Sequence, residues 1–176
     1  MAKKAVFGTH MFRHLFPRLT PKGPRGAELF AAVVSEARRP QWYSALGVPD
    51  TIDGRFSMVA TIAALVSVRL ERGGEEARAA TVALTERFVE TMDAEHRQLG
   101  LGDPTVGKVV RKLVGGLSRR IALWREIAAG GDWMRASADS VDGADGGSQG
   151  LADELRAFWR RIEETSDTDL LGGRFR

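Results

Sequence analysis

The sequence of 176 residues has a length that suits one domain with a sizeable core. Its hydrophobic share of 43% and charged share of 28% are those of an ordinary globular chain. The absence of cysteine excludes disulfide bonds, thiolate metal sites and cysteine nucleophiles. The net charge is only +3, so the distribution of charge along the chain is more informative than its sum.

The first predicted element is a basic amphipathic segment, residues 1–26. Residues 1–27 contain six Lys or Arg and no acid. Large apolar side chains recur there at helical spacing, which is typical of a helix that lies on a membrane surface. They are Phe7, Met11, Phe12, Leu15 and Phe16. The alternative is that this helix covers the domain core. The linker PKGPRG at 21–26 follows it.

The rest of the chain predicts an all-α fold, a single-domain helical bundle of about five main helices. Apolar periodicity and helix-breaking residues predict long helices at 27–38, 51–72, 75–99, 104–129 and 151–165, and a short helical turn at 41–46. We place the helical domain at 27–166, with a flexible Gly-, Asp- and Ser-rich loop at about 136–150 and a tail at 167–176.

Two of these helices carry strong expectations about burial. In the second long helix, the uncharged run Met58–Val68 is too short to span a bilayer, which takes about 20 residues, so it is expected to lie in the core. In the third, the residues expected inside are Val82, Leu84, Phe88, Val89 and Met92.

The stretch YSALGVPDTIDGRFSM, Tyr43 to Met58, breaks local helix rules just before the apolar run. Gly47 and Pro49 break a helix, and Asp50 or Thr51 is expected to cap the next one. A glycine and a cation then share the first turn, as Asp53, Gly54 and Arg55. In the interpretation we favour, these charged residues hold the loop on the bundle, with Asp93 as the partner of Arg55. The alternative is that Arg55 faces a binding partner.

A second basic stretch, 108–125, holds six Lys or Arg and again no acid. The basic surface candidates are Lys108, Arg111, Lys112 and Arg119. Such patches favour an anionic partner, which includes lipid headgroups, RNA or an acidic protein surface. A plain solvated basic face explains each patch equally well.

The sequence offers no catalytic constellation. The run GDPTVGKV at 102–109 is close to a phosphate-binding loop, but Val109 replaces the required Ser or Thr and a helix is expected before it. His10 and His14 are four residues apart and have no third metal ligand nearby. No nucleophile stands beside a base. We therefore expect no catalytic residue, no metal, no cofactor and no small-molecule substrate.

Tyr43–Met58 followed by a long apolar helix resembles the ubiquinol–cytochrome c chaperone family. A second block, from Met92 and Asp93 through LGLGDPTVGK to Arg111 and Lys112, resembles the same family. The likeness covers about residues 27–129. It implies a non-catalytic helical chaperone that binds newly made cytochrome b during assembly of respiratory complex III. In the mitochondrial members it also implies a position near the ribosomal tunnel exit and a small partner protein.

A chain rich in Ala, Arg and Gly without a targeting extension looks more like a bacterial member, peripheral on the cytoplasmic side of the inner membrane. A eukaryotic member is expected on the matrix side. The candidate client-binding residues are Trp42, Tyr43, Arg55 and Phe56. For each aromatic residue we favour a plain core position over an exposed contact. The competing function is a ribosome- or RNA-binding protein, or a general membrane-surface adaptor, resting on the two basic patches.

Overall fold

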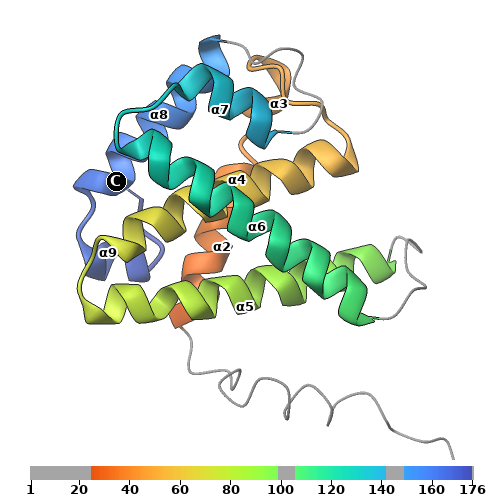
Figure 1. Cartoon of the computed structure of the whole chain (residues 1–176), viewed down its shortest axis with the longest axis horizontal. Helices are drawn as coiled ribbons and strands as arrows, with labels where there is room; N and C mark the ends of the chain where they lie inside the picture. The colour runs from red at the N-terminus through yellow and green to blue at the C-terminus, as the bar shows by residue number, and fades with distance from the viewer. Residues whose placement is uncertain (1–24, 99–105, 142–148, 176) are drawn as a thin grey trace, which may run out of the picture.

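The computed structural model describes residues 25–98, 106–141 and 149–175. Within these ranges the chain is all-α, as the sequence predicts, and contains no β-strand. In chain order the helices are α2 (Arg25–Ala37), α3 (Pro40–Ser44), α4 (Ile52–Glu71), α5 (Glu75–Gln98), α6 (Val106–Ala128), α7 (Trp133–Ser140), α8 (Gln149–Glu164) and α9 (Asp167–Leu171) (Figure 1). The long helices α2, α4, α5, α6 and α8 correspond to the five that apolar periodicity predicts.

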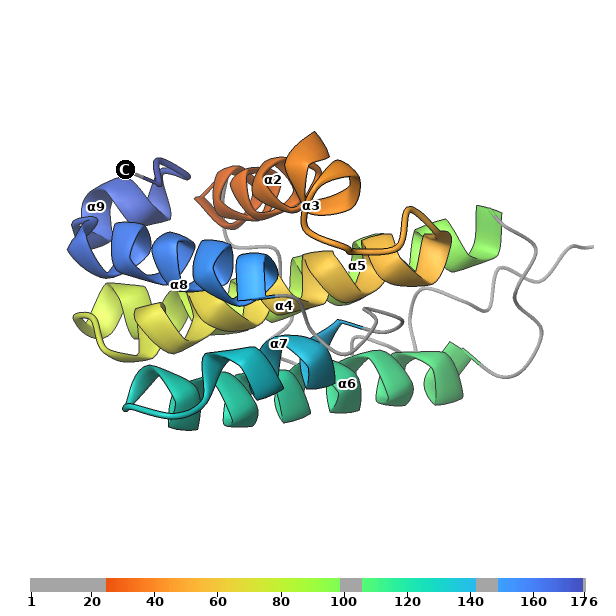
Figure 2. The same cartoon turned by 90° about the horizontal axis from the view of Figure 1, so that it is seen from above.

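Helix α4 runs through the middle of the molecule. Figure 2 shows it between a layer formed by α2 and α3 and a layer formed by α6 and α7, with α5 beside it. Helices α8 and α9 pack at the C-terminal end of α4. There Arg69 and Arg72 of α4 and its C-cap bond to residues 162–167 at the end of α8 and the start of α9. The other described helices therefore form a shell around α4.

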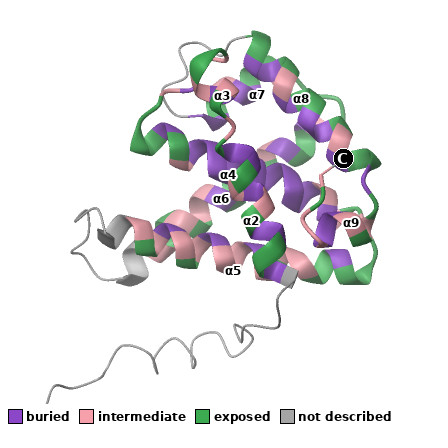
Figure 3. Ribbon diagram, turned by 180° about the vertical axis from the view of Figure 1, so that it is seen from behind, coloured by how far each residue is buried: buried purple, intermediate pink, exposed green. Residues whose placement is uncertain are grey.

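The apolar sequence of α4 explains this central position. Of its 20 residues 14 are buried, so a single amphipathic stripe does not describe it. Every residue from Met58 to Val68 is buried, as predicted (Figure 3). Burial of each large aliphatic side chain contributes about 1.5–3 kcal/mol, so this helix supplies much of the free energy of folding.

Polar side chains on α4 find partners inside the bundle. Thr61 Oγ1 lies 2.7 Å from Ser140 Oγ at the end of α7, and the indole N–H of Trp124 on α6 donates to the same hydroxyl oxygen over 3.1 Å. Arg120 Nε donates to the carbonyl oxygen of Ser140 over 3.0 Å. A hydrogen-bonded cluster at Ser140 thus joins α4, α6 and α7, where an unpaired polar group would be costly.

The outer helices α5, α6 and α8 are amphipathic. Leu84, Phe88 and Met92 of α5 face the core as expected, but Val82 is 54% exposed and its predicted burial is wrong. The reason is geometric: successive residues are 100° apart around a helix, so positions 82 and 84 are 200° apart and cannot face one core together. Val82 consequently lies on the outward face of α5.

The predicted loop and tail need correction. The sequence predicts a loop at about 136–150, but helix α7 spans Trp133–Ser140, so residues 136–140 are helical. Of that predicted loop, residues 142–148 lie outside the described ranges. Helix α9 lies in the predicted tail, where Leu170 and Leu171 are buried and the ring of Phe175 lies 5.6 Å from that of Phe158. Residues 167–175 therefore pack as part of the bundle. The predicted N-terminal amphipathic helix lies outside the described residues.

The cluster at Ser140 yields a first prediction. Ser140→Ala removes the oxygen that pairs with Thr61 and Trp124, so we expect a loss of about 1–3 kcal/mol in the free energy of unfolding. Urea denaturation followed by circular dichroism measures it. Ser118→Ala, at an exposed position of α6, is the control and is expected to change stability by less than about 0.5 kcal/mol. Equal stabilities of the two variants would contradict the role of the cluster.

Candidate functional site

Residues 43–58 form the corner where α3 leads into α4, which we call the α3–α4 corner. Gly47 has a φ of 79°, a conformation that side chains rarely allow. Val48 is 2% exposed and anchors the loop in the core. Thr51, and not Asp50, caps α4: its Oγ1 accepts a hydrogen bond from the backbone N–H of Gly54 over 3.1 Å. The backbone of the corner is thus fixed at three points.

Gly54 is at the tightest point of the corner. It is buried, and a Cβ placed on it would overlap the carbonyl oxygen of Pro49. The glycine in the first turn of α4 therefore has a packing reason: only hydrogen fits between helix and loop. Asp53 beside it is exposed in the first turn, where a carboxylate favours the positive end of the helix dipole.

Arg55 pairs with Asp50, five residues earlier, instead of the expected Asp93. Its Nε and Nη2 each lie 2.6 Å from Asp50 Oδ1. Both side chains are more than half exposed, so this pair orders the surface of the corner without acting as a buried clamp. The predicted buried fork between helices is therefore wrong, and close packing at Gly54 and Val48 holds the loop instead.

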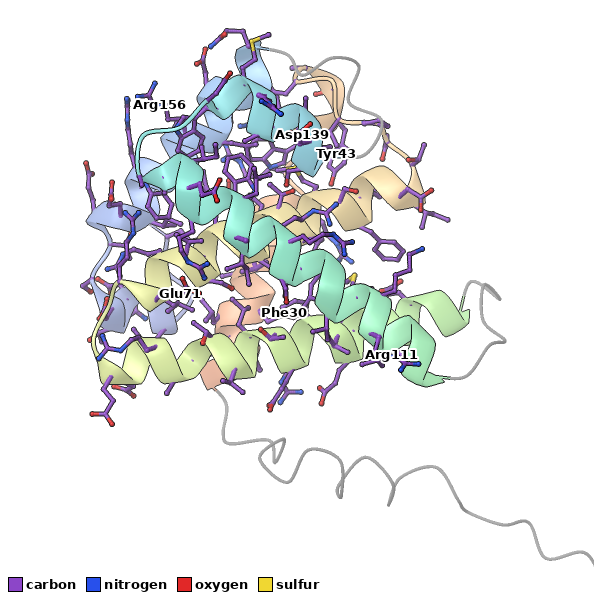
Figure 4. The ribbon with its side chains drawn as sticks, in the orientation of Figure 1. Phe30, Tyr43, Glu71, Arg111, Asp139 and Arg156 are labelled. Carbon is purple, nitrogen blue, oxygen red and sulfur yellow. The ribbon has the colours of Figure 1, made fainter. Side chains whose placement is uncertain are left out.

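Tyr43 lies beside this ion pair (Figure 4). The guanidinium of Arg55 lies 5.3 Å from the centre of the Tyr43 ring, within the range of a cation–π contact. The Tyr43 hydroxyl donates to the carbonyl oxygen of Ala37 over 2.7 Å. Burial raises the pKa of Tyr43, an effect opposed by the nearby charge of Arg55, so the hydroxyl keeps its proton and its donor role at neutral pH.

Trp42 is a core residue and not a surface contact. It is fully buried, and its indole N–H donates to the carbonyl oxygen of Glu36 over 2.7 Å. The Glu36 carboxylate in turn accepts from Arg39 and Arg161 over 2.7 and 2.9 Å, which joins α2 and α3 to α8. A fully buried indole cannot contact a binding partner, so Trp42 is not a client-binding residue in this structure.

Ile52 is a candidate that sequence reasoning missed. It is 47% exposed in the first turn of α4. Val59, seven residues later and on the same side of the helix, is only 7% exposed, so the side chain becomes accessible only in this first turn. Arg55 and Phe56 follow Ile52 by three and four residues, so all three side chains share one face. Phe56 is half-buried against the core.

The basic surface of α6 is only partly available. Arg111, Lys112 and Arg119 are exposed, with Arg111 near the N-terminal end of the helix (Figure 4). Arg125 makes two hydrogen bonds to Glu71 at the end of α4, at 2.9 and 2.8 Å, and Arg120 bonds inside the Ser140 cluster. The side chain of Lys108 is outside the described set. Arg111, Lys112 and Arg119 thus give α6 an exposed basic surface.

A separate depression of about 430 Å³ lies at the other end of α4, lined by Arg69, Arg72, Gly73, Gly74, Glu163 and Asp167. Its charges are paired: Arg69 lies 2.9 Å from Asp167, and Arg72 lies 3.2 Å from Glu163. A hydrogen bond from the Gly74 N–H, with the nearby Arg69, lowers the pKa of Asp167. This depression is the joint between α4 and the C-terminal helices.

The described residues contain no group of three or more His, Cys, Asp or Glu arranged to hold a metal ion. No helix among them has the length and hydrophobicity needed to cross a bilayer.

The fold and the α3–α4 corner define an all-helical protein with an apolar and cationic face at the start of its central helix. A model of the ubiquinol-cytochrome C chaperone family matches residues 44–176. The chain therefore belongs to this chaperone family. From the sequence motifs the family likeness was placed at about residues 27–129. The family model instead matches from Ser44 to the last residue, Arg176.

A solved relative supports the architecture. The crystal structure of the Cbp3 homolog from Brucella abortus matches with a TM-score of 0.67 at 21% identity, over 86% of this chain and 88% of that one. At this identity the likeness shows the fold. No curated protein matches the chain.

Gly54 yields a second prediction. Gly54→Ala forces the helix and the Pro49 carbonyl apart, so we expect it to cost about 1–3 kcal/mol of folding free energy. Gly116→Ala on α6 is the matched control: its new methyl group meets only Arg120 at 3.7 Å, and it is expected to stabilise the chain by about 0.5–1 kcal/mol. Chemical denaturation of both variants measures the difference. A Gly54→Ala chain as stable as the parent would disprove the close approach.

Proposed function

We propose that this chain is a non-catalytic assembly chaperone that binds newly made cytochrome b and assists assembly of ubiquinol–cytochrome c reductase at the membrane. The family match over residues 44–176 carries the proposal, because it includes residues 44–58 of the α3–α4 corner. A chaperone needs a reversible binding surface for its client and no reacting group or cofactor, which agrees with the chemistry expected from the sequence.

The face shared by Ile52, Arg55 and Phe56 is the proposed client contact. A membrane-protein client presents apolar helices, and an apolar side chain in the first turn of α4 offers them a contact that excludes water. Tyr43 borders this face through its contact with Arg55 and packs in part against the core. Because the exposed apolar area is small, the contact is weak, as release of the client requires.

The N-terminal segment is proposed to place the chaperone at the membrane. Its apolar residues Phe7, Met11, Phe12 and Phe16 suit the interface between headgroups and acyl chains, and its Lys and Arg residues suit anionic lipid. In a bacterium this site is the cytoplasmic side of the inner membrane, and in a mitochondrion the matrix side. A single amphipathic segment gives reversible attachment.

A second candidate function rests on the exposed cations Arg111, Lys112 and Arg119 of α6. They favour contact with RNA phosphates, as in ribosome association, without sequence preference. This function predicts RNA binding that weakens steeply with salt and is unaffected by changes at Ile52. Absence of binding to ribosomes at low salt would count against it.

The client proposal is tested in a strain that lacks the gene. We expect the absorbance of cytochrome b and the amount of complex III to fall, while other respiratory complexes stay near their normal level. Ile52→Asp is expected to restore neither. Replacing the apolar contact by a carboxylate costs on the order of 1.4 kcal/mol, which is about tenfold in client affinity.

Met134→Asp is the control for this experiment. Met134 is 45% exposed on α7, close to the 47% of Ile52, and it too lies in the first turn of its helix. We expect this variant to restore complex III fully. Circular dichroism and a urea midpoint close to that of the parent chain establish that both variants fold. Normal complex III in the deletion strain, or full rescue by Ile52→Asp, would refute the proposal.

A further inference from the structure

The outward face of α5 combines exposed apolar and acidic side chains. Ala79, Val82, Glu86 and Glu90 recur at steps of three or four, so they share one side of the helix, away from the core. Val82 is 54% exposed, the highest fraction among the large hydrophobic side chains that the structure describes. The charged residues among these four are both glutamates, Glu86 and Glu90, so this face is acidic.

One carboxylate oxygen of Glu86 stands out on this face. Its Oε1 is shielded from solvent and has no hydrogen-bond partner among the residues that the structure describes. Burial and the charge of Glu90 raise the pKa of Glu86. Glu90 itself lies 3.3 Å from Arg87, on the exposed surface. A carboxylate oxygen that is hidden from water and unpaired is unfavourable, and a cation placed beside it would remove that cost.

The chain enters the described region beside this face. A Cβ placed on Gly26, in the first turn of α2, would lie 3.1 Å from the Cβ of Ala83, the neighbour of Val82. The N-terminal end of α2 therefore lies beside α5, close to its apolar and acidic surface (Figure 1). The surface from Val82 to Glu90 is about 12 Å long, and the six linker residues 19–24 reach about 20 Å. Every part of this face is within reach of the N-terminal segment.

The N-terminal segment has the complementary chemistry. It carries Lys and Arg without any acid up to Ala27, and its large apolar residues recur at helical spacing. We infer that residues 3–18 dock on the outward face of α5, with the Phe side chains over Ala79 and Val82 and a Lys or Arg beside Glu86. The docked position and the membrane position use the same apolar residues, so the segment occupies one or the other. The inference does not depend on the client proposal.

A disulfide experiment on the full chain tests this docking. The natural chain has no cysteine, so Gly8→Cys with Val82→Cys introduces a single pair. Position 8 lies among the apolar residues of the segment, and a cysteine is a small apolar substitute. We expect the intramolecular disulfide to form under oxidised glutathione about tenfold faster than in a matched pair, because docking raises the effective concentration. Non-reducing electrophoresis of the denatured monomer measures the rates.

The matched pair is Gly8→Cys with Met134→Cys, since Met134 on α7 is 45% exposed and Val82 is 54% exposed. Adding Glu86→Lys to the Val82 pair should slow its disulfide several-fold, because a cation there repels the segment. Equal rates for the two pairs, no effect of Glu86→Lys, or a predominantly dimeric product would overturn the inference. If the parent chain binds vesicles of equal parts phosphatidylcholine and phosphatidylglycerol while the two rates in buffer are equal, the segment is a membrane contact only.

Discussion

Burial of α4 on all sides is the constraint on which the rest of the structure depends. A helix that presents apolar side chains in every direction needs neighbours in every direction, so the other helices are arranged as its shell. Its polar positions limit how the shell is built. The Thr61 hydroxyl pairs with that of Ser140, which fixes the end of α7, and Arg69 donates to the carbonyl oxygens of Ile162 and Thr165, which fixes the end of α8. One apolar helix with a few directional bonds thus determines the places of its neighbours.

Most of the fold is predictable from the sequence, because its long helices carry either a strong apolar period or a continuous apolar run. The exceptions are short. Helix α7 begins at the Asp132 cap, but its buried residues Ala136, Ser137 and Ser140 are small, and in sequence small polar residues are typical of a loop. Helix α9 has only five residues, so its buried pair Leu170 and Leu171 forms no detectable period. Both helices are stabilised by contacts with residues distant in sequence, which composition does not reveal.

The candidate site was predictable as a location but not in its details. The unusual residues of the Tyr43–Met58 stretch marked the corner, and the glycine at 54 marked a close approach of backbone. Which side chains point outward depends on tertiary packing. Trp42, for which a core position was favoured over a client contact, lies in the core, whereas Ile52, which the sequence analysis does not single out, is 47% exposed. The partner of Arg55 is also local. Asp50, five residues earlier in the loop before α4, accepts its hydrogen bond instead of a residue of another helix.

The bonds of Arg69 have a consequence for the timing of folding. This guanidinium lies in the first half of the chain, yet its partners lie more than 90 residues later, at Ile162, Thr165 and Asp167. During synthesis α4 therefore leaves the ribosome long before the helices that complete its cover. Until then its apolar surface is open to other apolar chains, and the nascent protein shares the hazard of a membrane protein awaiting insertion. Native packing around α4 is completed only when the last helices have emerged.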